Sequence, residues 1–449
     1  MQKDLTQGSV LKNLLIFSVP FLISSFLQTF YGLADLFIAG QFNGADVISA
    51  VSIGSQVTHM LTVIIVGLAM GTTVTISRAV GAKQDKEIAR GMGNTILLFL
   101  CFAAAATVLL CLSVNGILGL ISTPPEAVEE ARKYLLICFL GVPFITAYNV
   151  ISSIFRGMGD SRTPMYFVAV AGIFNIVLDY ILIGPLRMGA AGAALATVTA
   201  QALSVIFALT ALMKKDMGIA FSWKDIRFER DMVSRILKIG VPIAVQDGFI
   251  QISFLVITAI ANSRGVTVAA SVGIVEKVIC FVFLVPSAMM SAVSAIAAQN
   301  AGAGMHEQGK QVLKYGTIVG VVFGAVVAGI CQFGAEGIVS LFVNGDTEVV
   351  CLGGQYLRSY IFDCMFASIH FCFSGYFCAY GKAYISFLHN VISVLLVRIP
   401  GTYLTSVYFP DTLYPMGWAA PMGSLLSALI CIGVFLWLWS EKNRRKVFI

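Results

Sequence analysis

The sequence is divided into long apolar segments, each about as long as a helix that crosses a lipid bilayer. A spanning α-helix needs about 20 mostly apolar residues to traverse a hydrocarbon layer of roughly 30 Å. Twelve segments meet this requirement, and they cover residues 13–38, 47–76, 91–114, 132–155, 164–184, 190–213, 235–260, 269–298, 313–334, 354–379, 383–406 and 416–440. Because apolar and polar residues do not alternate within them, the pattern predicts an all-α polytopic membrane protein with twelve transmembrane helices.

The composition agrees with lipid as the main surroundings of this chain. Hydrophobic residues make up 58% and charged residues 12% of the 449 residues, whereas soluble proteins carry about 25% charged residues. The ten cysteines lie mostly inside the apolar segments without a Cys-x-x-Cys pair, which indicates buried apolar side chains rather than a disulfide or metal framework. Zinc-ligand spacing, a phosphate-binding loop and a Ser/His/Asp arrangement are not found, so we expect neither enzyme activity nor a cofactor.

Lysine and arginine are distributed unevenly between the two ends of the apolar segments. If the N-terminus lies inside, 22 of the 29 basic residues fall in inner segments and 4 in outer segments, namely Arg132, Lys133, Arg187 and Arg264. Cytoplasmic loops of membrane proteins carry such an excess. The pattern predicts a multi-pass protein of the cytoplasmic (inner) membrane with both termini in the cytoplasm. The net charge of +6 is then a consequence of topology, and we expect no nucleic-acid partner.

The chain consists of two halves with the same plan. A shift of 222 residues brings landmarks into register, among them Pro20 with Pro242, Tyr134 with Tyr356, and Gly159 with Gly381. The longest polar connection separates the halves, which predicts a first lobe over residues 1–213 (helices 1–6), a cytoplasmic linker over 214–231 and a second lobe over 232–449 (helices 7–12). Six spans per half give parallel repeats, which favours a transporter with two bundles around a central cleft. A duplicated channel or membrane scaffold is the alternative from another class.

Four polar side chains in the first half are expected to lie at similar depth in the membrane. Asp35 and Asp179 each lie about 8 Å below the outer end of their segment, at 1.5 Å per residue, and Thr197 about 12 Å below. Asn175 is one helical turn deeper than Asp179, on the same helix face. Since a charge in hydrocarbon costs several kcal/mol, such residues are candidates for function. We therefore predict one site formed by all four.

The second half does not repeat this polar group. The equivalent positions of Asp35, Asn175 and Asp179 are Ile257, Val397 and Gly401. Polar residues that only stabilise the helix bundle would tend to recur in both halves. The absence of this polar group from the second half therefore favours a functional role over a structural one. Two neighbouring carboxylates in a low dielectric cannot both ionise cheaply, and the pair is expected to bind a proton or, with the amide and hydroxyl oxygens, a sodium ion. The residues leave both ions open.

The second half has its own set of polar residues inside the apolar segments. We interpret these as internal ion pairs, with a substrate site or second cation site as the alternative; the set comprises Asp247, Gln251, Glu276, Lys277, Asp363 and Arg398.

Several stretches, taken together and in order, resemble the multidrug and toxic compound extrusion (MATE) family. They are "LTQGSVLKNLLIFSVPFLISSFLQTFYGLADLFIAGQF", "AVGAKQDKEIARG", "FRGMGDSRTPM", "FNIVLDYILIGPLRMGAAGAALAT" and "VRIPGTYL". The resemblance covers essentially the whole chain and is strongest to the prokaryotic, DNA-damage-inducible type. It implies a secondary active antiporter that exports drugs or metabolites, mainly organic cations, in exchange for H⁺ or Na⁺ by alternating access. A flippase for lipid-linked sugars of the same superfamily is the alternative.

The resemblance also implies roles for individual residues. The cation-binding aspartate of helix 1, the Asn-x-x-x-Asp of helix 5 and the threonine of helix 6 match Asp35, Asn175, Asp179 and Thr197. Asn149 matches a further polar position of that lobe, and we expect Pro20, Gln28 and Tyr31 to line the same cavity. The NorM-type branch uses a glutamate of helix 7 and an aspartate of helix 10 instead. In this chain Ile250 or Gln251 takes the position of the helix 7 glutamate, and Asp247 is displaced from it. Asp363 is about one turn from the expected position of the helix 10 aspartate. We expect small-molecule substrates, contact with membrane lipid and a monomer.

Overall fold

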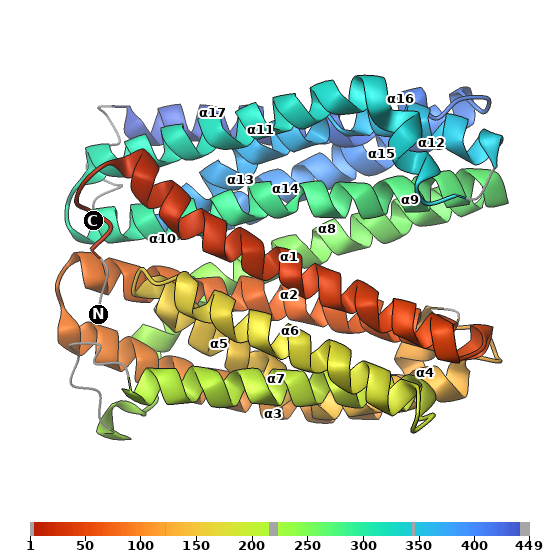
Figure 1. Ribbon diagram of the computed structural model, residues 1–449. Helices are drawn as coiled ribbons and strands as arrows, with labels where there is room; N and C mark the ends of the chain where they lie inside the picture. Colours follow the sequence, from red (N-terminus) through yellow and green to blue (C-terminus); the bar gives the residue numbers. More distant parts are fainter. Residues whose placement is uncertain (1–3, 122, 215–222, 344–345, 441–449) are drawn as a thin grey trace. The chain divides into compact units, whose positions relative to one another are not determined.

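The computed structural model describes residues 4–121, 123–214, 223–343 and 346–440, and these are folded into helices without a strand (Figure 1). Eleven helical stretches are long and apolar enough to span a membrane, or twelve if the bent pair Val128–Leu140 and Val142–Gly157 is one span. The predicted all-α fold with twelve spans is therefore confirmed. Residues 215–222 of the expected linker lie outside the described residues, as do some of the basic residues used for orientation: Lys3, Lys215, Lys442, Arg444, Arg445 and Lys446.

The chain forms two compact units. The first contains Val19–Gly240, and the second contains Leu5–Ser18 and Val241–Ile449. These units differ from the expected lobes at two segments, because residues 5–18 group with the second unit and residues 232–240 with the first. The lobe boundaries that we expected from the sequence stay predictions.

The first unit is a bundle of long helices. It is built from most of α1 (Val10–Phe42), α2 (Ala45–Gly81), α3 (Asp85–Leu120), α4 (Val128–Leu140), α5 (Val142–Gly157), α6 (Arg162–Ile183), α7 (Gly189–Lys214), the short η1 (Trp223–Asp225) and the first turns of α8 (Arg230–Asn262). The 47° bend between α4 and α5 occurs at Gly141, just before Pro143. Proline lacks the N–H that would continue the hydrogen bonds of α4, which explains the break at this point.

The second unit has more interrupted helices. It continues α8 and contains α9 (Val266–Val282), α10 (Leu284–Gly302), α11 (His306–Ser340), α12 (Thr347–Tyr360), α13 (Asp363–Ala379), α14 (Ala383–Ser393), η2 (Val394–Arg398), α15 (Ile399–Tyr408), α16 (Tyr414–Gly417) and α17 (Ala419–Trp439). The η2 segment is a π-helical turn that ends two residues before Pro400. Such turns interrupt a helix locally and are frequent at functional sites.

The packing inside the units follows the duplication seen in the sequence. Tyr134 is 1% exposed and its hydroxyl lies 3.0 Å from that of Ser55, so it joins α4 to α2. Its ring fills the space beside Gly54, where a Cβ atom would overlap with it. The equivalent Tyr356 is 2% exposed in the second unit. By contrast, Leu112 on α3 is 81% exposed, as expected for a side chain that contacts lipid.

Candidate functional site

Asp35 and Thr197 meet in the interior of the first unit. Asp35 lies on α1 and is 3% exposed, and its Oδ2 accepts a hydrogen bond of 3.1 Å from the hydroxyl of Thr197 on α7. A buried carboxylate is strongly stabilised by a hydrogen bond of this kind, because in apolar surroundings the carboxylate loses its contacts with water. This contact connects two helices that lie far apart in the sequence.

Asn175 and Asp179 approach the same point from α6. The helix starts at the side chain of Asp160, whose Oδ1 accepts hydrogen bonds from the backbone N–H groups of Arg162 and Thr163. It ends at Gly184, directly before a proline that cannot continue it. The four-residue spacing between Asn175 and Asp179 places both on one face of α6, and both are fully buried.

Together these residues offer a set of hard oxygen atoms. Asn175 and Asp179 lie beside the carboxyl group of Asp35. Yet both carboxyl oxygens of Asp179, Oδ1 of Asp35 and the side-chain amide of Asn175 are buried without a hydrogen-bond partner among the described residues. Such a group can hold a proton between the two carboxyls or bind a small hard cation through carboxylate, amide and hydroxyl oxygens. The residues present therefore fit a proton or a sodium ion.

Small residues allow these helices to approach closely. Ala193, Ala194 and Ala196 on α7 are completely buried, and α6 and α7 run side by side (Figure 1). A Cβ atom at Gly192 would lie 3.2 Å from the backbone carbonyl of Leu182 on α6. The "GAAGAALAT" stretch thus brings Thr197 within reach of the polar residues on its neighbours, as small residues do between membrane helices.

Tyr31, an expected cavity residue, connects the polar group to Gln201, which we did not predict. Its hydroxyl is 3.4 Å from Nε2 of Gln201 on α7, and its ring packs against α6 at Gly172, where a Cβ atom would lie 3.2 Å from Cδ1 of the ring. Gln201 follows Thr197 by four residues and so lies on the same helix face. This spacing was a signal in the sequence that we did not use.

Among the described residues, no hydrogen bond connects the other expected cavity residues to Asp35. Asn149 on α5 is 4% exposed, and its amide donates to the backbone carbonyl of Ile145 at 2.8 Å, within its own helix. Gln28 on α1 is half-buried. Pro20 is buried inside α1, and the hydroxyl of Ser24 donates to its carbonyl at 3.0 Å. Such back-bonding by serine is often found where a helix bends.

In the second unit, Arg398 is the centre of a separate polar group. It is 7% exposed, its Nη2 donates to the hydroxyl of Tyr360 at 2.6 Å, and its guanidinium lies 4.8 Å from the centre of the Phe254 ring. Glu276 and Asp363 attract it electrostatically. Arg398 is thus attracted by two acids without a salt bridge to either among the described residues, so the internal ion pairs stay a prediction. The hydrogen bond of Arg398 is made to a tyrosine that the sequence did not single out.

The remaining candidates of the second unit are divided. Asp363 is completely buried, and the Oε2 atom of Glu276 accepts a hydrogen bond of 3.2 Å from Thr258. Lys277 is exposed, and Asp247 and Gln251 are half-buried on α8. The hydrogen bonds around Arg398 and Glu276 do not include these last three residues. The structure thus brings three of the six predicted residues together.

Comparisons with known proteins agree with the duplicated plan. The sequence model of the MatE family matches this chain twice, over residues 20–181 and 242–404. The "Probable multidrug resistance protein YpnP" of Bacillus subtilis (strain 168) is 30% identical over 410 residues, which cover 90% of each chain. The "Multidrug export protein MepA" of Staphylococcus haemolyticus (strain JCSC1435) is 25% identical over 380 residues, or 84% of this chain and 83% of that protein.

A solved structure shows the same fold. It is described as the outward-facing conformation of a multidrug resistance MATE family transporter of the MOP superfamily, and it superimposes with a TM-score of 0.89. The match is 21% identical and covers 99% of this chain and 97% of that chain. The members of this family are transporters rather than enzymes. The duplicated helical fold and the two family matches therefore show that this chain belongs to the MatE family of multidrug efflux transporters of the membrane.

Proposed function

We propose that this protein exports organic small molecules, mainly cations, across the cell membrane in exchange for H⁺ or Na⁺. The observation that supports this proposal is the buried pair of Asp35 and Asp179, which interact with each other and keep three carboxyl oxygens without a hydrogen-bond partner among the described residues. Asn175 and Thr197 lie beside this pair. Two such carboxylates need a cation to share their site at modest energy. A coupling ion that enters from outside the cell and leaves to the cytoplasm supplies this cation.

The proposed mechanism is alternating access. Binding of the coupling ion neutralises the carboxyl pair, which lets α1 pack against α6 and α7 in one of two arrangements. In one arrangement the substrate is released to the outside, and in the other the ion leaves to the cytoplasm and a new substrate binds. Pro20 and the serine back-bonds nearby on α1 supply a point where this helix can bend. A flippase is not favoured, because the buried base Arg398 is attracted by two acids instead of forming a cationic cavity.

The test measures efflux of a fluorescent organic cation from proteoliposomes under an imposed pH or sodium gradient. Asp35→Asn and Asp179→Asn should reduce gradient-driven efflux to the level of empty liposomes. Asp46→Asn provides the matched control, since it makes the same chemical change at an exposed position of α2. Full coupled transport in both site variants, with normal folding by size-exclusion chromatography, would overturn the mechanism. Running each gradient separately identifies the coupling ion.

The proposed orientation places both termini in the cytoplasm and has its own test. Cys351 is exposed at the start of α12 and should lie outside the cell, whereas Lys224 should lie inside. In a variant that keeps Cys351 as its single cysteine, a membrane-impermeant maleimide should label intact cells. In a variant whose single cysteine is introduced by Lys224→Cys, the maleimide should label the protein only after the cells are lysed. The reverse pattern would show that the orientation is inverted.

A further inference from the structure

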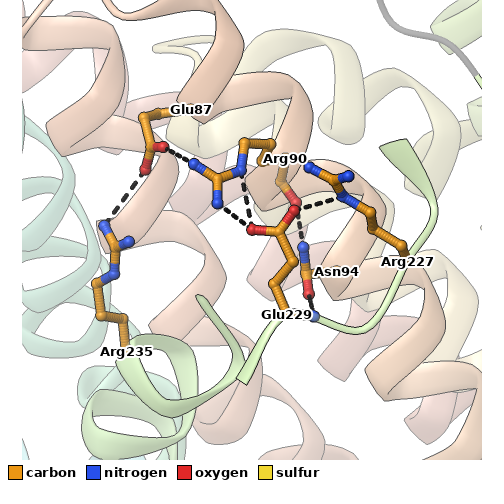
Figure 2. A network of polar contacts seen from close by, with 6 residues as sticks. All are labelled: Glu87, Arg90, Asn94, Arg227, Glu229 and Arg235. Atoms are coloured by element: carbon orange, nitrogen blue, oxygen red, sulfur yellow. Dashed lines mark hydrogen bonds and ion pairs between the residues drawn. The ribbon is translucent and has the colours of Figure 1, made fainter. Parts of the chain in front are cut away.

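A network of charged side chains holds the end of the linker on α3 (Figure 2). The linker network consists of Glu87, Arg90, Asn94, Arg227, Glu229 and Arg235. Arg90 is central: its Nε donates to Oε2 of Glu229 at 2.8 Å, and its Nη1 pairs with Glu87 one turn earlier in α3. Arg227 also pairs with Glu229, and Arg235 on α8 reaches Glu87 at 3.3 Å. Three separate stretches of the first unit are thus joined.

Asn94 adds a contact that involves the backbone. It is completely buried, its Oδ1 accepts the backbone N–H of Glu229 at 2.6 Å, and its Nδ2 donates to the carbonyl of Arg90 at 2.9 Å. Next to it, Gly93 lies directly against the carbonyl of Asp225, so that a Cβ atom at this position would overlap with the linker backbone. The linker end therefore packs on α3 through main-chain atoms as well as through charges.

The first turns of α8 are attached to α2 in the same manner. A Cβ atom at Gly71 would overlap with the carbonyl of Ile236, and one at Gly240 with the carbonyl of Leu68. These reciprocal glycine contacts bring the two backbones together, as small residues do in membrane helix pairs. Residues 225–240 are consequently held to the first unit by both packing and polar contacts, and α8 passes into the second unit directly after Gly240.

The polar part of the network is partly shielded from water. The side chain of Glu229 is 16% exposed and that of Glu87 is 25% exposed. The Arg90 guanidinium beside Glu229 holds the pKa of that carboxyl below its usual range. Two nitrogens of Arg90 donate to Oε2 of Glu229, and Arg227 donates to Oε1. Such a network of charge-assisted hydrogen bonds is more stabilising than an isolated surface ion pair.

The second unit contains a comparable pair that is used differently. Glu307 and Lys310 on α11 are three residues apart, as Glu87 and Arg90 are on α3, and they lie 2.8 Å from each other. The side chain of Glu307 is 70% exposed, and the ammonium of Lys310 lies 4.1 Å from the centre of the Trp439 ring. The acid–base pair thus occurs in both repeats, but in the first unit its base also binds the linker.

We propose that Arg90 is a positioning residue for transport: through Glu229 and together with Asn94, it keeps the linker end and the first turns of α8 attached to the first unit. This inference rests on the proposed alternating-access function for its consequence in transport, but not for the attachment itself. Any bending of α8 is then confined to the part after Gly240, where Pro242 interrupts the hydrogen bonds of the helix. The linker is accordingly part of the moving machinery rather than a passive connection.

The attachment is tested by hydrogen exchange on the full-length protein in lipid nanodiscs. Arg90→Gln and Asn94→Ala should each accelerate exchange of peptides that cover residues 225–235 by about tenfold or more, because the hydrogen bonds that close this segment are lost. Lys310→Gln is the matched control and should leave the same peptides unchanged. High salt should accelerate exchange in the unaltered protein, since screening weakens partly exposed ion pairs. Unchanged exchange in both network variants would overturn the proposed attachment.

The role in transport is tested separately in proteoliposomes. Arg90→Gln should lower the maximal efflux rate several-fold with the substrate KM and the choice of coupling ion unchanged, and Arg90→Lys should recover part of the rate. A loosened segment with normal transport would show that the attachment is structural and would overturn the positioning role. If the unaltered protein shows no cation-driven efflux, the proposed function fails, whereas the exchange measurement still decides whether Arg90 holds the linker.

Discussion

The two units contain buried carboxylates in different electrostatic surroundings. In the first unit, Asp35 and Asp179 interact with each other, with Asn175 and Thr197, and with nearby tyrosines, but not with a basic side chain among the described residues. In the second unit, Glu276 and Asp363 attract the buried guanidinium of Arg398. Duplication thus preserved the helical frame, while the charges inside it diverged.

This difference supports the proposal that the polar group of the first unit is the one that binds an external ion. A buried charge costs several kcal/mol unless it is paired or neutralised. The second unit supplies a positive charge from its own chain, so its polar group is expected to be stable at all stages of transport. Around the carboxyl pair of the first unit no such base lies among the described residues, and under the proposed function a proton or metal cation supplies the balancing charge. The predictions below change this balance in one unit at a time.

The largest effect is expected when the positive charge of the second unit is removed. Arg398→Met leaves the buried Asp363 and the half-buried Glu276 without their base, which should destabilise the protein by roughly 3–5 kcal/mol. Thermal unfolding in detergent measures this as a lower melting temperature. Adding Asp363→Asn should recover part of the loss, and Lys277→Met should have little effect because Lys277 is exposed. A single Arg398→Met variant as stable as the unaltered protein would contradict the assigned balance.

A smaller effect is expected when one ligand of the first unit is removed. Thr197→Val keeps the shape of the side chain but deletes the hydrogen bond to Asp35, which is worth roughly 1.5–3 kcal/mol for a charged acceptor. If sodium is the coupling ion, its half-maximal concentration should rise about tenfold or more, because a hydroxyl oxygen of the site is lost. If the proton is the coupling ion, its half-maximal concentration should instead fall, because the carboxylate of Asp35 loses a hydrogen bond that stabilises its charged form. Thr210→Val is the control, because Thr210 donates to its own helix on an exposed face of α7. An equal shift in both variants would disprove the role of Thr197.

A similar or slightly smaller effect is expected when α6 and α7 are forced apart. Gly192→Ala places a methyl group 3.2 Å from the carbonyl of Leu182, which is closer than ordinary van der Waals contact. Overpacking of this kind costs about 1–3 kcal/mol. It should lower both the melting temperature and the affinity for the coupling ion. Gly248→Ala provides the control, since a Cβ atom at Gly248 on α8 meets no atom within 4 Å.

The smallest effect concerns the linker network and depends on pH. The pKa of Glu229 in the folded protein is below its usual value because of Arg90 and, to a lesser extent, Arg227. Its contribution to stability is therefore fully present above the unfolded pKa of about 4.3 and is lost as the pH falls through the lower, folded pKa. Protection of residues 225–235 from exchange, corrected for intrinsic rates, should decrease over this acidic range. Glu229→Gln should remove this pH dependence. If the pH dependence persists in that variant, it arises from another titratable group.

Counting residues along the apolar segments selected the four polar residues that meet in the first unit, but it did not select all of their neighbours. The rise per residue of a helix is constant, so counting from the segment ends places Asp35, Asn175, Asp179 and Thr197 in one layer, and the structure brings these four together. The same counting gave no reason to select Tyr360, whose hydroxyl binds Arg398, or Gln201 beside Tyr31. Which way a helix faces, and which neighbour it meets, is set by packing.

By itself, the sequence determined the number of spans, the duplication and the positions where ionisable groups enter the membrane. These properties follow from local quantities: the length of an apolar segment, the similarity of two halves and the cost of burying a charge. Only the tertiary structure decided that Arg90 joins the linker to α3 and that the first turns of α8 belong to the first unit. Those contacts depend on close approach at Gly71, Gly93 and Gly240, where backbone meets backbone across segments that are distant in the chain.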